Sequence, residues 1–406
     1  MSKIQVKALY KIFGPKPKEA LQRLKNGDSK DEIHRETGMT VGVNNATFNV
    51  EEGEFFVIMG LSGSGKSTLI RLINRIIEPT SGAIQIDGED ITKLTKKELI
   101  QIRRGKLGMV FQNFGLLPHR NILQNVEYGL EVQNVATEKR EKRAREAIEV
   151  VGLNGYEDSK PDQLSGGMQQ RVGLARALAN ETDILLMDEA FSALDPLIRK
   201  EMQDELLQLQ EKLKKTVLFI THDLDEALKL GDRIAIMKNG RIVQIGTPEE
   251  ILTEPANKYV YNFVEDVDRS KILLAHQIMK KPDVVATWKE GPRGAIRRME
   301  EKGISSIFVI DKQHQLKGLL TIEAALESIR NDRWEKDLLV QDFYTTSPDT
   351  PLSDLITIAA NTKYPIAVTE GIKLVGIIVR VSILSGLILG KEKYITEDRE
   401  KETVHA

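Results

Sequence analysis

A glycine-rich run with one lysine stands at residues 60–67, Gly-Leu-Ser-Gly-Ser-Gly-Lys-Ser. Its spacing, G-x-x-x-x-G-K-S, is that of a phosphate-binding loop. Backbone N–H groups from Ser62 to Ser67 are expected to surround the β- and γ-phosphates of a nucleotide at a helix N-terminus. The glycines allow this close approach, the ammonium of Lys66 supplies a point charge, and the hydroxyl of Ser67 is expected to ligate Mg²⁺.

A second run, Leu-Ser-Gly-Gly-Met-Gln, follows at residues 164–169. It precedes an apolar stretch that ends in Asp188-Glu189 and continues as Ala-Phe-Ser-Ala-Leu-Asp195. Together the two runs resemble the ABC (ATP-binding cassette) family, whose signature motif the second run matches. The resemblance implies an ATPase whose two halves close around ATP. The first run then becomes the ATP site, with Gly60, Ser62, Gly63, Ser64, Gly65, Lys66, Ser67 and Thr68 as its residues.

The same resemblance gives roles to residues that follow apolar strands. Asp188 is expected to hold Mg²⁺ through water, with Ser67 and Gln112 as the other metal-binding residues. Glu189 stands where the family places the carboxylate that polarises the attacking water. Gln112 matches the Q-loop glutamine, which senses Mg²⁺ and the water. His222, in Thr-His-Asp, matches the switch histidine that contacts the γ-phosphate.

The aromatic ring that stacks on adenine in this family is expected at Phe13, just before Gly14. Tyr10 is the rival position, because an extra stretch at residues 15–39 separates Phe13 from the usual next strand. Packing in the core is the other role open to the ring of Phe13.

The signature implies that each ATP site is built from two chains. In the family, a serine and two glycines at a helix N-terminus face the γ-phosphate of ATP held by the opposite subunit, and the D-loop aspartate couples the two sites. The matching residues are Leu164, Ser165, Gly166, Gly167, Met168 and Asp195. Because the chain has one phosphate loop and one signature, a head-to-tail dimer with a second copy is the simplest assembly.

Apolar runs separated by helical patterns indicate a parallel sheet covered on both faces. The runs lie at residues 55–59, 107–111, 184–187 and 216–220. Residues 95–98 have the T-x-x-E form of a capping box and predict a helix start. The segment 113–163 is expected to be the helical subdomain. The expected fold over residues 1–265 is α/β, an ABC-type P-loop ATPase domain.

Two copies of one pattern follow residue 265, each a helix, a strand, a turn, a second strand and a helix. This pattern resembles a tandem pair of CBS domains, an α+β module. The strands are expected at residues 304–311, 316–320, 363–368 and 374–378. We expect a linker at 266–278, CBS domains at 279–336 and 337–390, and a tail at 391–406. The tail is expected to be mobile, because it mixes charge signs and has few large apolar groups.

CBS pairs often bind adenine nucleotides through a Thr or Ser followed two residues later by Asp. Thr321-Ile322-Glu323 is a near match, whereas Val379-Arg380-Val381 cannot hold a ribose in that way. Arg380 offers bidentate phosphate contact, and Tyr364 offers a face for stacking a base. The hypothesis is an anionic dinucleotide, cyclic di-AMP, bound at a dimer interface, and a purely structural dimerisation module is the alternative. Regulation by this ligand is what the resemblance to osmolyte importers, given below, implies. The candidate ligand residues are Tyr364, Ile377, Val379 and Arg380.

Five basic residues fall on one short predicted helix: Lys139, Arg140, Lys142, Arg143 and Arg145. Three glutamates interleave with them, so one interpretation is a solvated helix with internal ion pairs. The other is an ionic-strength switch, which docks on anionic lipid or another acidic surface at low salt. It would release as the screening length shortens from about 10 Å at 0.1 M.

Length and composition limit the remaining possibilities. With 406 residues, two or three domains are expected, and a net charge of −2 gives no case for nucleic-acid binding. The absence of cysteine excludes disulfides and thiolate metal sites and fits a reducing cytoplasm. The N-terminus lacks the apolar core of a signal peptide. No window approaches 18 consecutive apolar residues, so another polypeptide is expected to supply any membrane span.

The type of ABC protein follows from what accompanies the cassette. One cassette without heptad arrays or a fused permease favours a bacterial importer over translation-type and DNA-repair relatives. Residues 11–14, the insertion and Ala190-Phe191-Ser192 resemble the ATPase subunits of osmoregulatory glycine betaine/proline importers. This resemblance implies a separate permease with a substrate-binding domain or protein, at the cytoplasmic face of the bacterial membrane. Methionine or polyamine importers are the alternative, and a non-transport ABC ATPase is the contrasting class.

Overall fold

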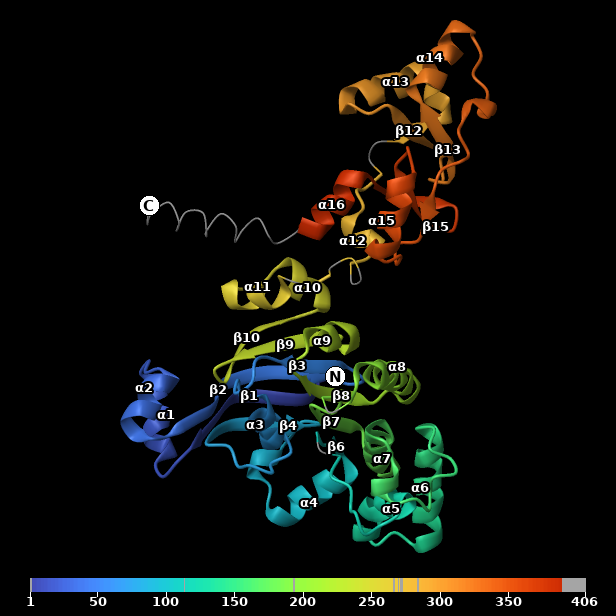
Figure 1. The fold of residues 1–406 in the computed structure, drawn as a ribbon. Helices are drawn as coiled ribbons and strands as arrows, with labels where there is room; N and C mark the ends of the chain where they lie inside the picture. Colours follow the sequence, from blue (N-terminus) through green and yellow to red (C-terminus); the bar gives the residue numbers. More distant parts are fainter. Residues whose placement is uncertain are drawn as a thin grey trace. The chain divides into compact units, whose positions relative to one another are not determined.

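The structure is a computed structural model that describes residues 2–112, 114–192, 194–265, 267–268, 270, 273–282 and 285–388. It divides into two compact units. The first unit comprises residues 1–251 and 255–264, and the second comprises residues 252–254 and the chain from residue 265. Figure 1 labels most of the helices and strands of both units. The tail predicted at 391–406 lies outside the described residues.

One sheet of the first unit is antiparallel, with the strand order β2-β1-β4-β5. Its strands are β1 (Ser2–Phe13), β2 (Thr40–Glu51), β4 (Ser81–Ile86) and β5 (Glu89–Asp90). Two helices occupy the insertion between β1 and β2, namely α1 (Pro17–Lys25) and α2 (Lys30–Thr37). Their buried residues Ala20, Leu24 and Ile33 pack against Ile12 and Met39. The insertion is therefore folded onto the end of this sheet, beside Phe13.

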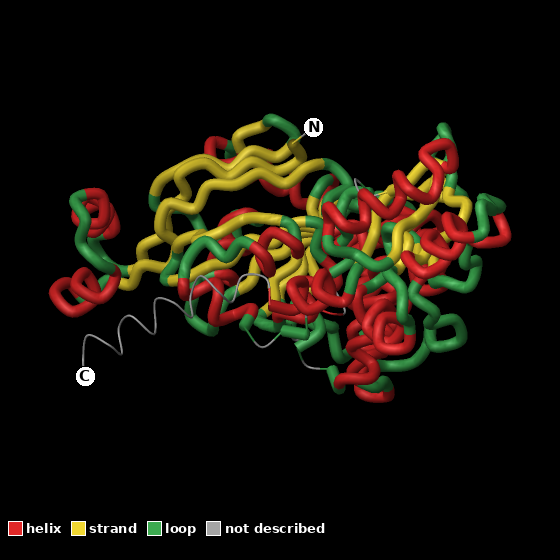
Figure 2. Tube along the Cα trace, turned by 90° about the horizontal axis from the view of Figure 1, so that it is seen from above, coloured by secondary structure: helices red, strands yellow, loops and turns green. Residues whose placement is uncertain are grey.

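The second sheet has six strands in the order β10-β9-β3-β8-β7-β6. The predicted runs form β3 (Phe55–Met59), β6 (Leu107–Val110), β7 (Ile184–Asp188) and β8 (Thr216–Thr221), joined by β9 (Arg233–Lys238) and β10 (Arg241–Gly246). The strands pair in parallel except β9 with β10, which confirms the predicted parallel sheet. Figure 2 shows the strands of both sheets in yellow. Since β3, β8 and β7 are neighbours, the segments that follow them meet at one edge of the sheet.

Helices connect these strands, and two more helices follow the last strand. They are α3 (Lys66–Ile73), η1 (Ile91–Lys93), α4 (Lys96–Gly105), α5 (Ile122–Val132), α6 (Thr137–Val150), η2 (Pro161–Gln163), α7 (Gly166–Ala179), α8 (Pro196–Leu213), α9 (Leu224–Leu230), α10 (Pro248–Thr253) and α11 (Lys258–Val264). The predicted capping box of α4 is present, because Thr95 and Glu98 bond each other's backbone N–H. Helices α5 and α6 lie within the segment expected to be the helical subdomain and pack with α7 (Figure 1).

The second unit contains two three-stranded sheets, β11-β12-β13 and β14-β15-β16, which confirm the predicted repeat. The first repeat has β11 (Val285–Thr287), η4 (Trp288–Glu290), α13 (Gly291–Lys302), β12 (Ser306–Ile310), β13 (Leu316–Thr321) and α14 (Ile322–Arg330). The second has η5 (Lys336–Leu338), β14 (Thr345–Thr346), α15 (Leu352–Asn361), β15 (Ile366–Glu370), β16 (Lys373–Ile378) and α16 (Arg380–Ile388). Phe308 and Leu319 of the first repeat share a core cluster with Ala367 and Leu374 of the second.

Part of the predicted linker belongs to this unit. Helix α12 (Ala275–Ile278) follows Leu273, and all three named residues are buried in the core of the second repeat. Leu352 donates its backbone N–H to the carbonyl of Leu273 at 2.7 Å. The prediction of a linker to residue 278 was therefore wrong. The apolar side chains of these residues stabilise the folded state when they are buried in this core. Within the part of the chain that the structure describes, no helix is long and apolar enough to cross a membrane.

Candidate functional site

The phosphate loop joins β3 to α3, which begins at Lys66. The free N–H groups of the first helical turn favour an anion at this position. Lys66 is buried, and its Nζ donates to the carbonyls of Gly60 at 2.8 Å and Leu61 at 3.3 Å. Burial lowers the pKa of Lys66, and the charges of Glu189 and Asp188 act in the opposite direction. A phosphate in the loop would thus meet a desolvated ammonium, for which attraction is stronger than in water.

Two glycines of the loop, Gly60 and Gly65, are required by their surroundings. Gly65 has a φ of +106°, and a Cβ there would lie 2.3 Å from the carbonyl oxygen of Gly42 in β2. A Cβ at Gly60 would lie 2.4 Å from another backbone oxygen. The turn between β9 and β10 also supports the loop, because Gly240 donates its N–H to the carbonyl of Ser64 at 2.8 Å. Contacts with β2 and with this turn therefore stabilise the conformation of the loop.

Asp188 ends β7 with a side chain that is suited to a metal ion. Its Oδ1 is buried without a hydrogen-bond partner, and Nη2 of Arg71 lies 3.8 Å from its Oδ2. Burial raises the pKa of Asp188, while Ser67 and Arg71 act to lower it. An unpartnered carboxylate oxygen near a serine hydroxyl fits Mg²⁺, which prefers oxygen ligands and keeps waters and substrate phosphates in its shell. The described residues contain no cluster of three or more His, Cys, Asp or Glu that could hold a metal without such help.

The three residues predicted to be catalytic meet at the carboxylate of Glu189. Nε2 of Gln112 donates to Oε2 of Glu189 at 3.3 Å and to Oγ of Ser192 at 3.2 Å. Nδ1 of His222 lies 3.5 Å from the same Oε2, and Nζ of Lys66 lies 3.8 Å from Oε1. Glu189 has a φ of +46°, a conformation that is uncommon for residues other than glycine and that occurs often at functional sites. The arrangement can hold a water beside a phosphate and accept its proton.

The two candidate adenine-stacking rings have different environments. Phe13 is 39% exposed, whereas Tyr10 packs against the core cluster formed with the insertion. The ring of Phe13 lies over Gly42, where a Cβ would come within 2.9 Å of the ring and 3.2 Å of Thr68. Nζ of Lys11 lies 5.0 Å from the ring centroid. The exposed ring beside the phosphate-loop helix favours Phe13 as the adenine contact.

The signature residues open α7. Oγ of Ser165 accepts the backbone N–H of Met168 at 3.3 Å, which makes Ser165 the N-cap of this helix. Ser165 and Gly166 are exposed, whereas Leu164 and Gly167 are buried. Asp195 in turn caps α8, with its Oδ1 accepting two backbone N–H groups at 3.1 Å. An exposed helix N-terminus on the surface is suited to receive an anion from another molecule.

Comparison with known proteins identifies the family. Residues 43–192 match the family model described as ABC transporter, and residues 277–331 and 336–388 match that of the CBS domain. The glycine betaine/carnitine transport ATP-binding protein GbuA of Listeria monocytogenes is 58% identical over 388 residues, which cover 95% of this chain and 98% of that protein. The chain belongs to the ABC transporter family.

Two further similarities support this assignment. The glycine betaine transport ATP-binding protein OpuAA of Bacillus subtilis is 54% identical to this ABC ATPase over 401 residues, covering 98% and 96% of the two chains. A solved ATP-binding cassette, dimeric and bound to ADP and Pi in a post-hydrolysis state, is 36% identical with a TM-score of 0.51. It covers 60% of this chain and 98% of its own.

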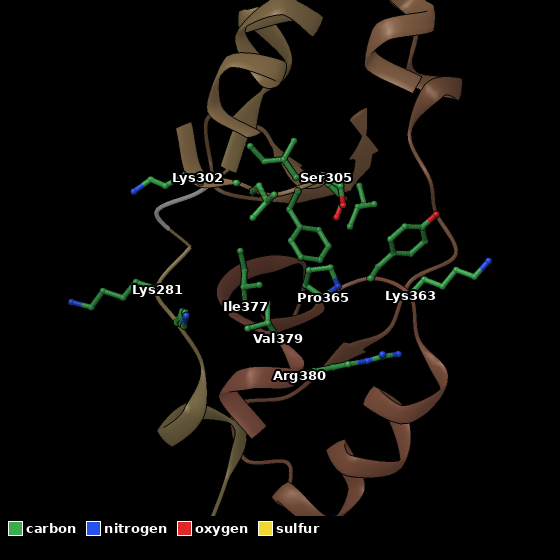
Figure 3. A pocket seen from close by; sticks show the side chains of 16 residues that line it. Lys281, Lys302, Ser305, Lys363, Pro365, Ile377, Val379 and Arg380 are labelled. Carbon is green, nitrogen blue, oxygen red and sulfur yellow. The ribbon is translucent and has the colours of Figure 1, made fainter. Parts of the chain in front are cut away.

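The CBS pair of this ABC ATPase contains a pocket of about 770 Å³. All four candidate ligand residues, Tyr364, Ile377, Val379 and Arg380, line it. Four lysines that sequence reasoning missed also line it, namely Lys280, Lys281, Lys302 and Lys363. Figure 3 shows Lys281, Lys302 and Lys363 at the rim with their side chains directed outwards, whereas Ile377 and Val379 face the interior. The pocket thus has an apolar interior and a basic rim, a combination that suits an organic anion.

The guanidinium of Arg380 is partly engaged within the protein. Its Nε donates to the carbonyl of Ala359 at 2.9 Å and its Nη2 to that of Thr362 at 2.7 Å. These bonds satisfy carbonyls at the C-terminal end of α15. A bidentate contact with phosphate, as expected from the sequence, would therefore require these bonds to be exchanged. Thr321 is the N-cap of α14 and does not line this pocket.

The five basic candidates lie on α6, and four of them are paired. Arg140 contacts Glu127 at 3.1 Å, Arg143 contacts Glu181 at 2.7 Å, and Arg145 contacts Glu141 at 2.8 Å. Lys142 lies 3.9 Å from Glu146, and Lys139 is exposed. These pairs favour the interpretation of a solvated helix with ion pairs over that of a free basic surface.

Proposed function

We propose that this chain hydrolyses ATP to power import of a compatible solute of the glycine betaine type through a separate permease. The observation that carries the proposal is the 58% identity, over nearly the whole chain, to a glycine betaine/carnitine transport ATP-binding protein. The convergence of Gln112, His222 and Lys66 on Glu189 supports hydrolysis as the reaction. The chain works at the cytoplasmic face of a bacterial membrane, with a permease that carries a substrate-binding domain or protein.

Two copies of the chain form the working ATPase. They pair head-to-tail, so that Ser165, Gly166 and Gly167 of one copy, with Leu164 and Met168 beside them, contact the γ-phosphate of ATP in the loop of the other. Asp195 of the D-loop also faces that ATP and couples the two sites. The exposed N-terminus of α7 supports this pairing, and the dimeric cassette bound to ADP and Pi is a precedent within the same family.

The residues around Glu189 perform the hydrolysis. Ser67, Asp188 and Gln112 hold Mg²⁺, which neutralises phosphate charge when bound. Glu189 orients the attacking water and accepts its proton, His222 contacts the γ-phosphate, and Phe13 stacks on adenine. ATP closes the dimer and completes the site, and the helical subdomain passes that motion to the permease near Gln112.

A panel of solutes tests the substrate class. The chain is reconstituted with its permease in vesicles, and ATP hydrolysis is measured with glycine betaine, proline, carnitine, choline, methionine and a polyamine. Stimulation by quaternary amines supports the proposal. Stimulation by methionine or the polyamine alone would instead favour another amine or amino-acid importer, and copurification with no membrane protein would favour a non-transport ATPase.

The CBS pair regulates this activity by binding cyclic di-AMP at a dimer interface. The basic rim, the apolar interior and the Tyr364 ring in one pocket support this ligand. Calorimetry with micromolar cyclic di-AMP tests it on the wild type, Arg380→Ala and Lys363→Ala, with Arg297→Ala on the exposed face of α13 as the control. Heat that is lost in the first two variants and kept in the control supports the site. If the wild type shows no heat of binding with cyclic di-AMP, the proposal is refuted and the CBS pair is a purely structural dimerisation module.

Ionic strength is the second proposed input. High salt screens the attraction of α6 for an anionic lipid surface over about 10 Å at 0.1 M, although the pairs of Arg140, Arg143 and Arg145 reduce the free charge. Changing all five basic residues of α6 to glutamine should flatten the salt dependence of transport. Lys96→Gln with Lys97→Gln, at two exposed positions of α4, is the control. Unchanged salt dependence in the five-fold variant would exclude α6 as the sensor.

A further inference from the structure

Glu226 is a buried carboxylate that the hydrolysis described above does not use. It lies in α9, four residues after His222, and its side chain is 7% exposed. Burial raises the pKa of Glu226. A charged group is costly at such a position unless it is hydrogen-bonded and paired, so the partners of Glu226 indicate what it holds together.

One oxygen of Glu226 organises the segment around the switch histidine. The hydroxyl of Thr221 donates to Oε2 of Glu226 at 2.6 Å, and the same hydroxyl accepts the backbone N–H of Asp223 at 2.9 Å. Oδ1 of Asp223 accepts the backbone N–H of Glu226 at 3.2 Å. Thr221 and Asp223, the residues on either side of His222, are thus each hydrogen-bonded to Glu226. These bonds hold the backbone that carries the imidazole.

The other oxygen of Glu226 faces α8, the helix that Asp195 caps. Nε2 of Gln203 donates to Oε1 of Glu226 at 3.2 Å, and Nε of Arg199 lies 3.8 Å from the same oxygen. Arg199 also donates from Nη2 to the carbonyl of Leu194 at 3.1 Å and from Nη1 to Oδ2 of Asp223 at 3.5 Å. Arg199 therefore contacts the residue before Asp195 and the residue after His222 at once.

A third charged pair closes the cluster from α9. Nζ of Lys229 donates to Oε1 of Gln203 at 3.3 Å and pairs with Asp204 at 2.6 Å. Gln203 is itself buried. Its amide is held in one orientation by bonds at both ends, with nitrogen to Glu226 and oxygen to Lys229. Each group of the cluster thus has several partners that restrict its rotation, and a shift of α8 would change the contacts of Glu226 with Gln203 and Arg199.

We propose that Glu226, with Arg199, is a positioning residue that couples the D-loop to the switch histidine. Contact of Asp195 with a second cassette would set α8, and the bonds of Arg199 and Glu226 would then place the imidazole of His222 for the γ-phosphate. The inference rests on the roles proposed above for Asp195 and His222. It makes hydrolysis in one site depend on the partner that binds at Asp195, without any contact between Glu226 and ATP.

Hydrolysis kinetics of the reconstituted importer provide the first test. Glu226→Gln keeps the size of the side chain but removes the charge that Arg199 faces. We expect kcat to fall about tenfold, since small misplacements of a catalytic group have effects of this size or larger, with KM for ATP unchanged within about twofold. Glu205→Gln is the matched control, because Glu205 is a partly buried carboxylate of α8 that pairs with Arg171 at 2.5 Å, away from His222. It should retain the wild-type kcat within about twofold.

A spectroscopic measurement separates positioning from a general structural role. The chain has six histidines, so ¹³C-histidine labelling of the full chain gives few NMR signals, and His222→Asn assigns the one of interest. Glu226→Gln should move the His222 signal, and Glu205→Gln should leave it in place. An unchanged kcat in Glu226→Gln, or a lower kcat with an unmoved His222 signal, would overturn the proposal.

Two further variants test the coupling and the role of His222 separately. If Glu226→Gln does not fold, Arg199→Gln removes the bonds to Leu194 and Asp223, and it should give the same loss of kcat at constant KM. A wild-type kcat in that variant would overturn the coupling. His222→Ala tests the underlying assumption separately, because a wild-type rate there would refute the role of His222 itself rather than the coupling through Glu226.

Discussion

Nδ1 of His222 lies 3.5 Å from Oε2 of Glu189, although the two residues follow different strands. The reason is the parallel pairing of β7 and β8, in which Asp188 is opposite Ile220 and Glu189 donates its N–H to the carbonyl of Ile220 at 3.1 Å. Residues that come just after each strand are therefore neighbours. The sheet thus places a carboxylate and an imidazole together at one edge.

The first prediction concerns Glu189. Glu189→Gln keeps a hydrogen-bonding side chain but removes the group that accepts the proton of the attacking water. Since a positioned general base contributes roughly 10²–10⁴-fold, ATP turnover should fall by at least about 10², while ATP binding is retained and the dimer stays closed. Phosphate release and nucleotide affinity are measured on the same sample. Glu211→Gln, on the exposed end of α8, is the control, and equal turnover in Glu189→Gln would place the base elsewhere.

Much of this edge could be predicted from the sequence. Strands β3, β7 and β8 are buried along their entire length, and each contains an unbroken run of four or five apolar residues. The short strands β11 and β14, of three and two residues, have no such pattern and were not predicted. A strand of two or three residues is too short to show a periodic pattern, and it forms because it pairs with a neighbouring strand.

Contacts between segments that are distant along the chain could also not be predicted from the sequence. Gly42 supports both Phe13 and the phosphate loop, yet it is an isolated glycine in a long strand whose role depends on tertiary contact. The bonds of Arg380 to the end of α15 and the lysines around the CBS pocket likewise depend on how the repeats fold. Arg71, which lies near Asp188, carried no motif that would have identified it.

The second prediction uses two glycines with the same backbone angle. Gly65 and Gly27 both have a φ of +106°, but a Cβ at Gly65 would lie 2.3 Å from the carbonyl oxygen of Gly42, whereas Gly27 has nothing within 4 Å. Gly65→Ala should abolish ATP binding, because the loop must move. Gly27→Ala should lower the free energy of unfolding by about 1–2 kcal/mol, because alanine is strained at a positive φ, and it should keep ATP binding. Fluorescent nucleotide binding and thermal unfolding of both variants decide between clash and backbone strain, and equal binding in the two would refute the steric account.

The third prediction distinguishes the two aromatic candidates. Phe13→Ala should lower ATP affinity about tenfold, because stacking of a base on an aromatic ring contributes about 1–3 kcal/mol. Tyr10→Ala should instead lower the thermal stability of the first unit, since this ring packs against the core of the insertion. Equilibrium titration with ATP and thermal unfolding are measured for both. A larger loss of affinity in Tyr10→Ala would reverse the assignment.

The fourth prediction concerns pH and Asp87. Burial acts to raise the pKa of Asp87, but its bonds to Lys106 and Lys3 outweigh this and hold the pKa below the ordinary value. A carboxylate with a lowered folded-state pKa contributes stability above its unfolded pKa of about 3.9 and loses it as pH falls through the folded value. Asp87 has a φ of +51°, which asparagine also adopts readily, so Asp87→Asn isolates the charge.

The expected loss in Asp87→Asn at pH 7 is small, about 0.5 kcal/mol, because the carboxylate is partly exposed. Thermal unfolding of both proteins from pH 7 to pH 3 should show two curves that converge as the pH falls. A difference that is constant across this range would show that the ion pairs with Lys3 and Lys106 do not contribute.

The most direct test of the central claim is uptake of radiolabelled glycine betaine into vesicles that hold the chain and its permease, with Mg-ATP on the side of the ATPase. A salt series with and without cyclic di-AMP completes the experiment. We predict uptake that needs ATP, is lost in Glu189→Gln, rises with salt and is suppressed by the dinucleotide. ATP hydrolysis without betaine uptake at any salt concentration would contradict the transport assignment and leave only the ATPase.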